Sequence, residues 1–273
     1  MNFIGMIEAA QKRNDSFLCV GLDPDISKFP RELHKENKPV FTFNKAVIDA
    51  TADLVCCYKP QIAYYAAIGA EDQLEQTIDY IHKTYPEIPV ILDAKRNDIG
   101  STAEMYAREV FERYGADAVT INPFMGSDTL EPFLKHKDKG VVILCKTSNP
   151  GSADFQNRLI DGKPLYMLIA EKASNEWNTN GNVCIVVGAT YPDEMKAIRS
   201  IAPNIPFLVP GVGAQGGDVK SVVKNGSTSN KKGLIINSSR AIIHASSESD
   251  FASQARQAAQ KQRIAINDAR QDC

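Results

Sequence analysis

Eight short apolar runs, spread along the whole chain, are the feature that most limits how this sequence can fold. They are nearly continuous rather than alternating and are rich in β-branched residues, a pattern typical of parallel strands buried on both faces. The runs lie at 17–22, 53–60, 89–95, 117–122, 140–146, 182–188, 206–212 and 233–239. Parallel strands of this kind need helices on the outer face of their sheet.

Stretches with helical spacing and charged faces lie between these runs, for example at 70–85, 100–115 and 164–178. Strand and helix therefore alternate. Eight β/α units predict a closed (β/α)8 TIM barrel rather than an open doubly wound sheet, which commonly has about six strands. The chain has 273 residues, close to the roughly 250 of a typical barrel. We predict a single α/β domain over residues 1–273.

Three polar segments depart from the alternation. Residues 152–163 and 225–233 are rich in turn-forming residues and are predicted to be surface excursions. Residues 254–273 predict a polar C-terminal helix or tail. This tail is compatible with a chain of natural length, and equally with one cut from a longer fusion.

Charge and hydropathy exclude several classes of protein. The 31 basic and 33 acidic side chains give a net charge of -2, so no excess positive charge is available for nucleic acid or anionic lipid. No apolar run approaches the roughly 20 residues of a membrane helix, and the first residues are too mixed for a signal peptide. We therefore expect a cytoplasmic protein.

Cysteine and histidine give little support for a metal site. Most cysteines lie inside the apolar runs, where a thiol behaves as a small buried hydrophobe: Cys19, Cys56, Cys57, Cys145 and Cys184. The four histidines are scattered, and neither CxxC nor HExxH occurs. We expect no metal.

The third run and the residues after it carry the most chemical information. Asp93 and Lys95 are two apart on a predicted strand, so their side chains should project to the same side, and Asp98 follows the strand end. Catalytic groups of barrels come from the C-terminal ends of strands. A lysine between carboxylates stays protonated despite burial and can hold and then protonate a forming anion. The alternative is an ion-pair network that only closes the bottom of the barrel.

Polar residues also interrupt the other runs at their ends. Lys59 lies in an apolar run, where an unpaired ammonium would be costly, so we expect Asp23 or Asp93 as its partner. Asp23 before Pro24 could instead begin a turn. The remaining candidates could cap helices or contact substrate: Asn122, Thr147 and Ser148.

The glycine-rich segment 208–218 follows the seventh run, where backbone N–H groups could approach an anion closely. The loops after strands seven and eight are the usual phosphate position in these barrels. Arg240, after the eighth run, can add a bidentate clamp. We therefore predict a phosphate-bearing substrate.

Together these residues resemble the orotidine 5′-phosphate decarboxylases, which make uridine monophosphate in pyrimidine synthesis, and in particular their longer-chain bacterial and protist branch. The resemblance spans nearly the whole chain. It rests on VGLDPD at 20–25, YKPQIAYY at 58–65, LDAKRNDIGSTA at 92–103, CKTSNPGS at 145–152, PGVGAQGGD at 210–218 and SSRAI at 238–242.

The resemblance implies a role for each matching residue. Asp93, Lys95 and Asp98 would form a charged array beside the substrate carboxylate, with Lys95 as proton donor and Lys59 in the same catalytic group. Asp98 and Thr102 would reach the neighbouring subunit's site, which implies a homodimer, while residues 211–218 form part of a lid. The implied substrate-binding residues are Asp23, Gln61, Thr102, Asn122, Thr147, Ser148, Gly213, Gln215, Gly216 and Arg240.

The resemblance implies no metal and no organic cofactor. A partner, either fused or associated, would be orotate phosphoribosyltransferase. One rival is a magnesium-dependent sugar-phosphate decarboxylase or aldolase of the same superfamily, which would want another carboxylate where this chain has Lys59, Pro60 and Gln61. The other rival is a catalytically silent phosphate-binding barrel.

Overall fold

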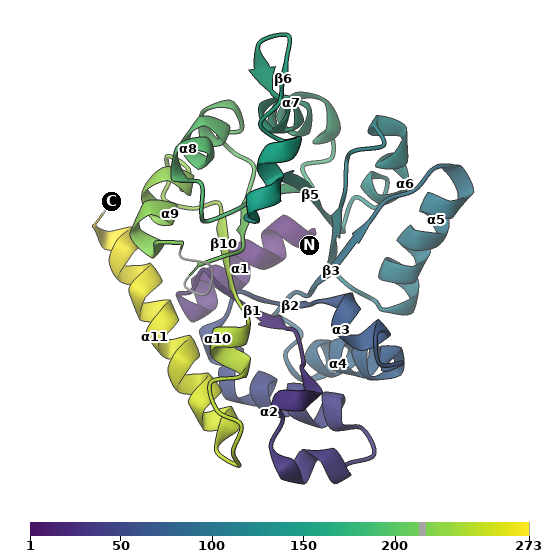
Figure 1. Ribbon diagram of the computed structural model, residues 1–273, viewed down its shortest axis with the longest axis vertical. Coiled ribbons are helices and arrows are strands. Elements are labelled where there is room, and N and C mark those ends of the chain that lie inside the picture. The colour runs from purple at the N-terminus through teal and green to yellow at the C-terminus, as the bar shows by residue number, and fades with distance from the viewer. Residues whose placement is uncertain (213–216, 273) are drawn as a thin grey trace.

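The protein, described here from a computed structural model for residues 1–212 and 217–272, is built around a ring of eight parallel strands (Figure 1). The strand order is β2-β1-β10-β9-β8-β5-β4-β3, and parallel bridges join Tyr58 to Val90 and Gln61 to Asp93 between the first and last strands. The ring is therefore a closed TIM barrel, as predicted. Its strands are β1 (Leu18–Leu22), β2 (Cys57–Pro60), β3 (Ile91–Arg96), β4 (Ala118–Ile121), β5 (Gly140–Lys146), β8 (Val183–Val187), β9 (Phe207–Val209) and β10 (Leu234–Ser238).

Helices surround this ring on its outer side, except for the first helix, which lies across one end of the ring (Figure 1). The α-helices are α1 (Phe3–Asn14), α2 (Pro39–Thr51), α3 (Ile62–Ala66), α4 (Glu71–Thr84), α5 (Gly100–Arg108), α6 (Glu131–Leu134), α7 (Leu165–Lys172), α8 (Pro192–Ile201), α9 (Val219–Gly226), α10 (Arg240–Ile243) and α11 (Phe251–Gln271). The short 3-10 segments are η1 (Ile26–Lys28), η2 (Arg31–Lys35), η3 (Ala52–Leu54), η5 (Ser127–Thr129) and η6 (Pro150–Asp154). One π-helical turn extends α5 and another extends α7: η4 (Glu109–Arg113) and η7 (Ala173–Trp177).

The inside of the barrel is a packed core to which every strand of the ring contributes. Its strand residues are Cys19, Cys57, Ile91, Ala118, Val142, Cys184, Val186, Leu208 and Ile235. Phe3 and Ile7 of α1 belong to the same cluster and cover one end of the barrel. Gly140 makes room for this helix, because a Cβ there would lie 2.2 Å from the Phe3 ring. The thiols of the five cysteines predicted to be buried are indeed buried.

A second, larger apolar layer lies between the strands and the helices. Helix α4 illustrates why these segments become helices: Leu74, Ile78 and Ile81 lie on one face and are fully buried. Acidic residues in its first turn and basic residues in its last turn match the helix dipole. No helix within residues 1–212 and 217–272 is both long and apolar enough to cross a membrane.

The predicted excursion at 152–163 contains the end of η6 and most of a small antiparallel hairpin, β6 (Leu159–Ile160) with β7 (Lys163–Pro164), which projects beyond the helices (Figure 1). The other excursion, 225–233, joins α9 to β10. Helix α11 packs on α2 and α9. Its buried residues include Phe251, Ala255 and Ile266, so this polar segment contributes one apolar stripe to the outer layer.

Candidate active site

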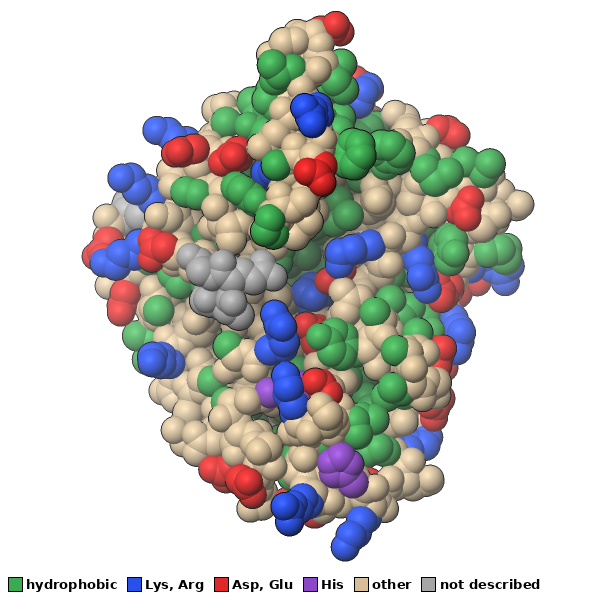
Figure 2. Space-filling view, viewed as in Figure 1, with side chains coloured by type: hydrophobic (Ala, Val, Ile, Leu, Met, Phe, Trp, Pro, Cys, Tyr) green, Lys and Arg blue, Asp and Glu red, His purple; other side chains and the backbone are tan. Residues whose placement is uncertain are grey.

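A pocket of about 160 Å³ lies where the C-terminal ends of five strands meet. Five of its lining residues were predicted from the sequence: Asp23, Lys59, Gln61, Asp93 and Arg240. Pro210, Gly211 and Val212 belong to the predicted glycine-rich segment, whereas no role was predicted for Asn237, Ser238 and Ser239. Lys and Arg side chains gather around the central hollow on this face (Figure 2). The ion pairs of Asp93 therefore lie at this end of the barrel and not at the bottom, where the alternative had placed them.

The centre of the site is a carboxylate held between two ammonium groups. Lys59 Nζ donates to Asp93 Oδ2 at 2.9 Å, and Lys95 Nζ donates to Asp93 Oδ1 at 2.6 Å. Burial alone would raise the pKa of Asp93, but the two lysines overcome this effect and hold its pKa well below its usual value. Burial opposes the charge on Lys59 as well, yet Asp93 and then Asp23 raise its pKa. Asp93 and Lys59 are therefore both charged at neutral pH.

Thr120 of β4 fixes this centre from the side and was not predicted. Its hydroxyl donates to Asp93 Oδ1 at 2.8 Å and accepts from the Lys95 backbone N–H at 3.0 Å. Lys95 has φ 47°, and the β3–β4 register shifts between Leu92 and Arg96. Asp93 and Lys95 thus meet as predicted, but through an irregular strand end rather than simple alternation. A left-handed backbone at a non-glycine residue costs roughly 1–3 kcal/mol and persists only where its surroundings impose it.

Asp23, directly after β1, lines the same pocket. Its Oδ2 accepts a short hydrogen bond from the hydroxyl of Ser239, which follows β10. Its Oδ1 is buried and has no partner among the described residues. A buried acceptor without a donor is costly. Asp23 Oδ1 can therefore accept a hydrogen bond from a donor that enters this pocket.

The glycine-rich segment after β9 borders the pocket next to Arg240. Gly211 has φ 96°, and its carbonyl accepts from Gly217 N at 3.2 Å, so the two ends of the loop lie close together. Arg240 begins α10, is exposed and lines the pocket. The candidate phosphate residues Gly213, Gln215 and Gly216 lie outside the described residues.

Of the other predicted residues, Gln61 lines this pocket, whereas Asn122, Thr147 and Ser148 do not. Gln61 Oε1 accepts from Ala63 N at 3.4 Å. Asn122 Oδ1 accepts from Phe124 N and borders a different cleft, of about 600 Å³, beside α7. Thr147 hydrogen-bonds Gln156 and Asn149.

Asp98 and Thr102 do not line the pocket of their own chain. Asp98 accepts a hydrogen bond from Ile99 N, and Thr102 is exposed in the first turn of α5. The sequence predicted an array of Asp93, Lys95 and Asp98. Within the described residues of one chain, the charged groups in contact are instead Lys59, Asp93 and Lys95.

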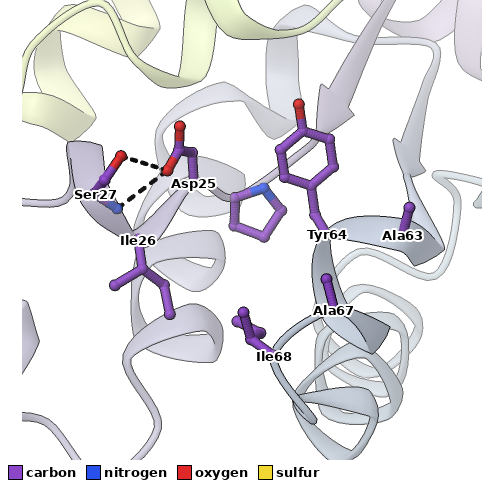
Figure 3. A pocket seen from close by; sticks show the side chains of 8 residues that line it. Asp25, Ile26, Ser27, Ala63, Tyr64, Ala67 and Ile68 are labelled. Atoms are coloured by element: carbon purple, nitrogen blue, oxygen red, sulfur yellow. Dashed lines mark hydrogen bonds between the residues drawn. The ribbon is translucent and has the colours of Figure 1, made fainter.

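A second hollow, of about 520 Å³, adjoins the loops that follow Asp23 and Gln61 (Figure 3). It is lined mainly by apolar groups, among them Ile26, Ala67 and Ile68. Asp25 is the carboxylate in this lining, and Ser27 donates to it through both its N–H and its hydroxyl. The charged groups of the first pocket do not line this hollow.

Within the described part of the chain, no three His, Cys, Asp or Glu side chains cluster in a way that could hold a metal ion. Fold and site together define a TIM-barrel enzyme with a preorganised charged centre at the C-terminal ends of its strands. A sequence model described as "Orotidine 5'-phosphate decarboxylase / HUMPS family" matches residues 16–255. The chain belongs to this family.

Similar proteins agree with this assignment. The chain is 55% identical over 267 residues to an orotidine 5′-phosphate decarboxylase of Ralstonia pickettii, with 98% of each chain covered. It is 56% identical over 272 residues to that of Cellvibrio japonicus, covering 99% of this chain and 100% of the relative. The structure of Leishmania donovani OMP decarboxylase superposes with a TM-score of 0.86 at 38% identity, covering 99% of both chains.

The structure of Leishmania donovani UMP synthase superposes with a TM-score of 0.88 at 39% identity. The match covers 99% of this chain but 57% of that one. The same barrel is therefore part of a longer polypeptide there.

Proposed function

We propose that this protein decarboxylates orotidine 5′-monophosphate to uridine 5′-monophosphate in pyrimidine biosynthesis, without metal or organic cofactor. The activity follows from family membership and from relatives about 55% identical over nearly the full chain. The single structural observation that carries the mechanism is the Lys59–Asp93–Lys95 array at the barrel mouth. The magnesium-dependent rival is not favoured, since Lys59 occupies the end of β2 where that rival would want a carboxylate.

In the proposed reaction, the bond between the pyrimidine ring and its carboxylate breaks and carbon dioxide leaves. The electron pair stays on the ring carbon, which the ring cannot delocalise well. Lys95 Nζ lies beside this carbon, stabilises the negative charge and then donates a proton to it. Because Asp93 and Thr120 already fix Lys95, little reorganisation is needed when the charge develops.

The rest of the substrate would bind through groups around the array. Asp23 and Lys59 would hold the ribose hydroxyls, a role supported by the free Oδ1 of Asp23. Arg240 would clamp the phosphate together with Gly213, Gln215 and Gly216. The other assigned contacts are Gln61, Asn122, Thr147 and Ser148, of which Ser148 would contact the edge of the pyrimidine. Binding energy from the phosphate would drive closure of the 211–218 lid and contribute to rate as well as affinity.

We further propose a homodimer with shared sites, in which Asp98 and Thr102 complete the neighbour's pocket. Two observations support it: both residues lie outside their own chain's pocket, and the apolar residues next to them, Ile99 and Met105, are 58% and 53% exposed. Exposed apolar side chains around a functional segment are typical of an interface. Mixing inactive Lys95→Ala and Asp98→Ala proteins should therefore restore part of the activity. Subunit exchange without any recovery would contradict the sharing.

The activity itself is tested with chelator-treated protein and orotidine 5′-monophosphate, followed as loss of the substrate's ultraviolet absorbance. Turnover without added metal is expected. Absence of turnover, combined with magnesium-dependent turnover of a sugar acid phosphate, would support the rival instead. Orotate phosphoribosyltransferase as supplier of the substrate, fused or associated, and a cytoplasmic location stay predictions.

A further inference from the structure

Lys146 is a buried cation that the proposed mechanism does not use. It ends β5, its residue is fully buried, and its Nζ donates to Ser152 Oγ and Asn157 Oδ1, both at 2.8 Å. Neither acceptor is charged, and within residues 1–212 and 217–272 Lys146 makes no ion pair. A buried ammonium without a carboxylate is expensive, and an apolar side chain of similar length would cost less. The location of this charge therefore calls for a reason beyond packing.

The ammonium organises the turn that follows β5. It lies 4.2 Å from the centre of the Tyr191 ring, a cation–π contact that partly offsets its desolvation. Burial lowers the pKa of Lys146, and Glu194 opposes this shift. A chain of hydrogen bonds runs from Lys146 to Ser152, from Ser152 Oγ to Tyr191 OH at 3.4 Å, and from Tyr191 OH to the Asn149 carbonyl at 3.2 Å.

In the sequence, Ser148 lies between Lys146 and Asn149, the two ends of this chain of hydrogen bonds. Its carbonyl accepts from Thr190 Oγ1 at 3.1 Å. Gly188 at the end of β8 packs directly against it, because a Cβ on Gly188 would lie 2.7 Å from Ser148 Cα. Strand β5 is also joined to Gly188, since Gly188 N donates to the carbonyl of Lys146 at 2.8 Å. Backbone contacts thus fix Ser148 on one side, and the turn organised by Lys146 fixes it on the other.

We propose that Lys146 is a positioning residue for base recognition, which holds Ser148 at the edge of the pyrimidine. This inference rests on the proposed function, in which Ser148 contacts the base. Lys146 touches no substrate; it acts through Ser152, Tyr191 and Asn149. Its loss should therefore weaken binding of the base and leave binding of the ribose phosphate unchanged.

The test compares two competitive inhibitors, uridine 5′-monophosphate and ribose 5-phosphate, which lacks the base. In Lys146→Met the inhibition constant of the nucleotide should rise about tenfold, the size of one lost hydrogen bond, while that of ribose 5-phosphate stays within about twofold of wild type. Lys172→Met is the control, because Lys172 is an exposed lysine paired with Glu176; it should change neither constant. A folded Lys146→Met protein in which both constants change equally, or neither changes, would overturn the proposal.

A double-mutant cycle separates this role from general destabilisation. If Lys146 acts through Ser148, the losses in nucleotide affinity from Lys146→Met and Ser148→Ala should not add; full additivity would refute the coupling. If Lys146→Met does not fold, Ser152→Ala breaks the same chain and must show the same selective loss, and an unchanged ratio of the two constants refutes the role. Wild-type protein that fails to decarboxylate would overturn the proposed function. Normal turnover with an unchanged ratio would overturn only the role of Lys146.

Discussion

Replacing Thr120 by valine would remove one hydroxyl and leave the shape of the side chain nearly unchanged. This hydroxyl makes two hydrogen bonds, one to Asp93 Oδ1 and one from the Lys95 backbone N–H. Thr120 is 1% exposed, so water cannot replace either bond. Without them, the left-handed backbone of Lys95 loses the contact that fixes it.

The size of the effect follows from the charge on Asp93. A hydrogen bond to a charged group contributes about 1.5–3 kcal/mol, and about 1.4 kcal/mol corresponds to a tenfold change in rate. Thr120→Val should therefore lower kcat/KM for orotidine 5′-monophosphate by about 10- to 150-fold. Since Lys95 acts on the developing carbanion, most of the loss should appear in kcat rather than in KM.

The assay is the loss of substrate absorbance, measured together with the free energy of unfolding in urea. Thr77→Val is the matched control: Thr77 is also fully buried and its hydroxyl also makes two hydrogen bonds, to the Gln73 carbonyl and from Asn44. The control should lose stability and keep kcat within about twofold of wild type. If Thr120→Val retains wild-type kcat, or if the two variants lose the same activity, the reasoning on Thr120 is wrong.

Three further predictions concern residues around the site. Lys59→Met should lower the free energy of unfolding by roughly 3 kcal/mol in urea denaturation, because one member of a buried ion pair is lost. A loss of unfolding free energy smaller than that caused by replacing an exposed lysine with methionine would contradict this prediction. Burial lowers the pKa of His244 from 6.5, so the folded protein favours the neutral ring. The free energy of unfolding should therefore fall as the pH drops below 6.5, and His244→Phe should flatten that decline between about pH 6.5 and 5. Gly188→Ala should place a Cβ against the Ser148 backbone and raise KM for the substrate in a variant that still folds. An unchanged KM in the folded variant would count against the packing argument.

The sequence was sufficient to predict the barrel because each strand is a nearly continuous apolar run. It also predicted the contact between Asp93 and Lys95, as well as Asp93 as one of two expected partners for Lys59. The barrel and the Lys59 pair follow from local pattern and from the rule that functional groups lie at strand ends. Asp93 and Lys95 meet through an irregular strand end that the alternation argument did not include.

Residues that act across strands were missed for a physical reason. Thr120 lies in the middle of the apolar run 117–122, and only the β3–β4 register brings its hydroxyl to Asp93. Ser239 meets Asp23 only because β10 pairs with β1. A polar residue inside an apolar run was the available signal for Thr120. For Ser239, proximity to Arg240 in sequence was the signal.

The bridge between Gln61 and Asp93 is where the strand ring closes. The ion pair between Lys59 and Asp93 spans the same junction. Transient separation of β2 from β3 would therefore pull apart the charged groups that the reaction needs in contact. A ligand that engages both residues would brace the ring, and amide hydrogen exchange of β2 and β3 should slow when it binds. The interactions that close the barrel between β2 and β3 are therefore also the interactions that hold the charged groups of the site together.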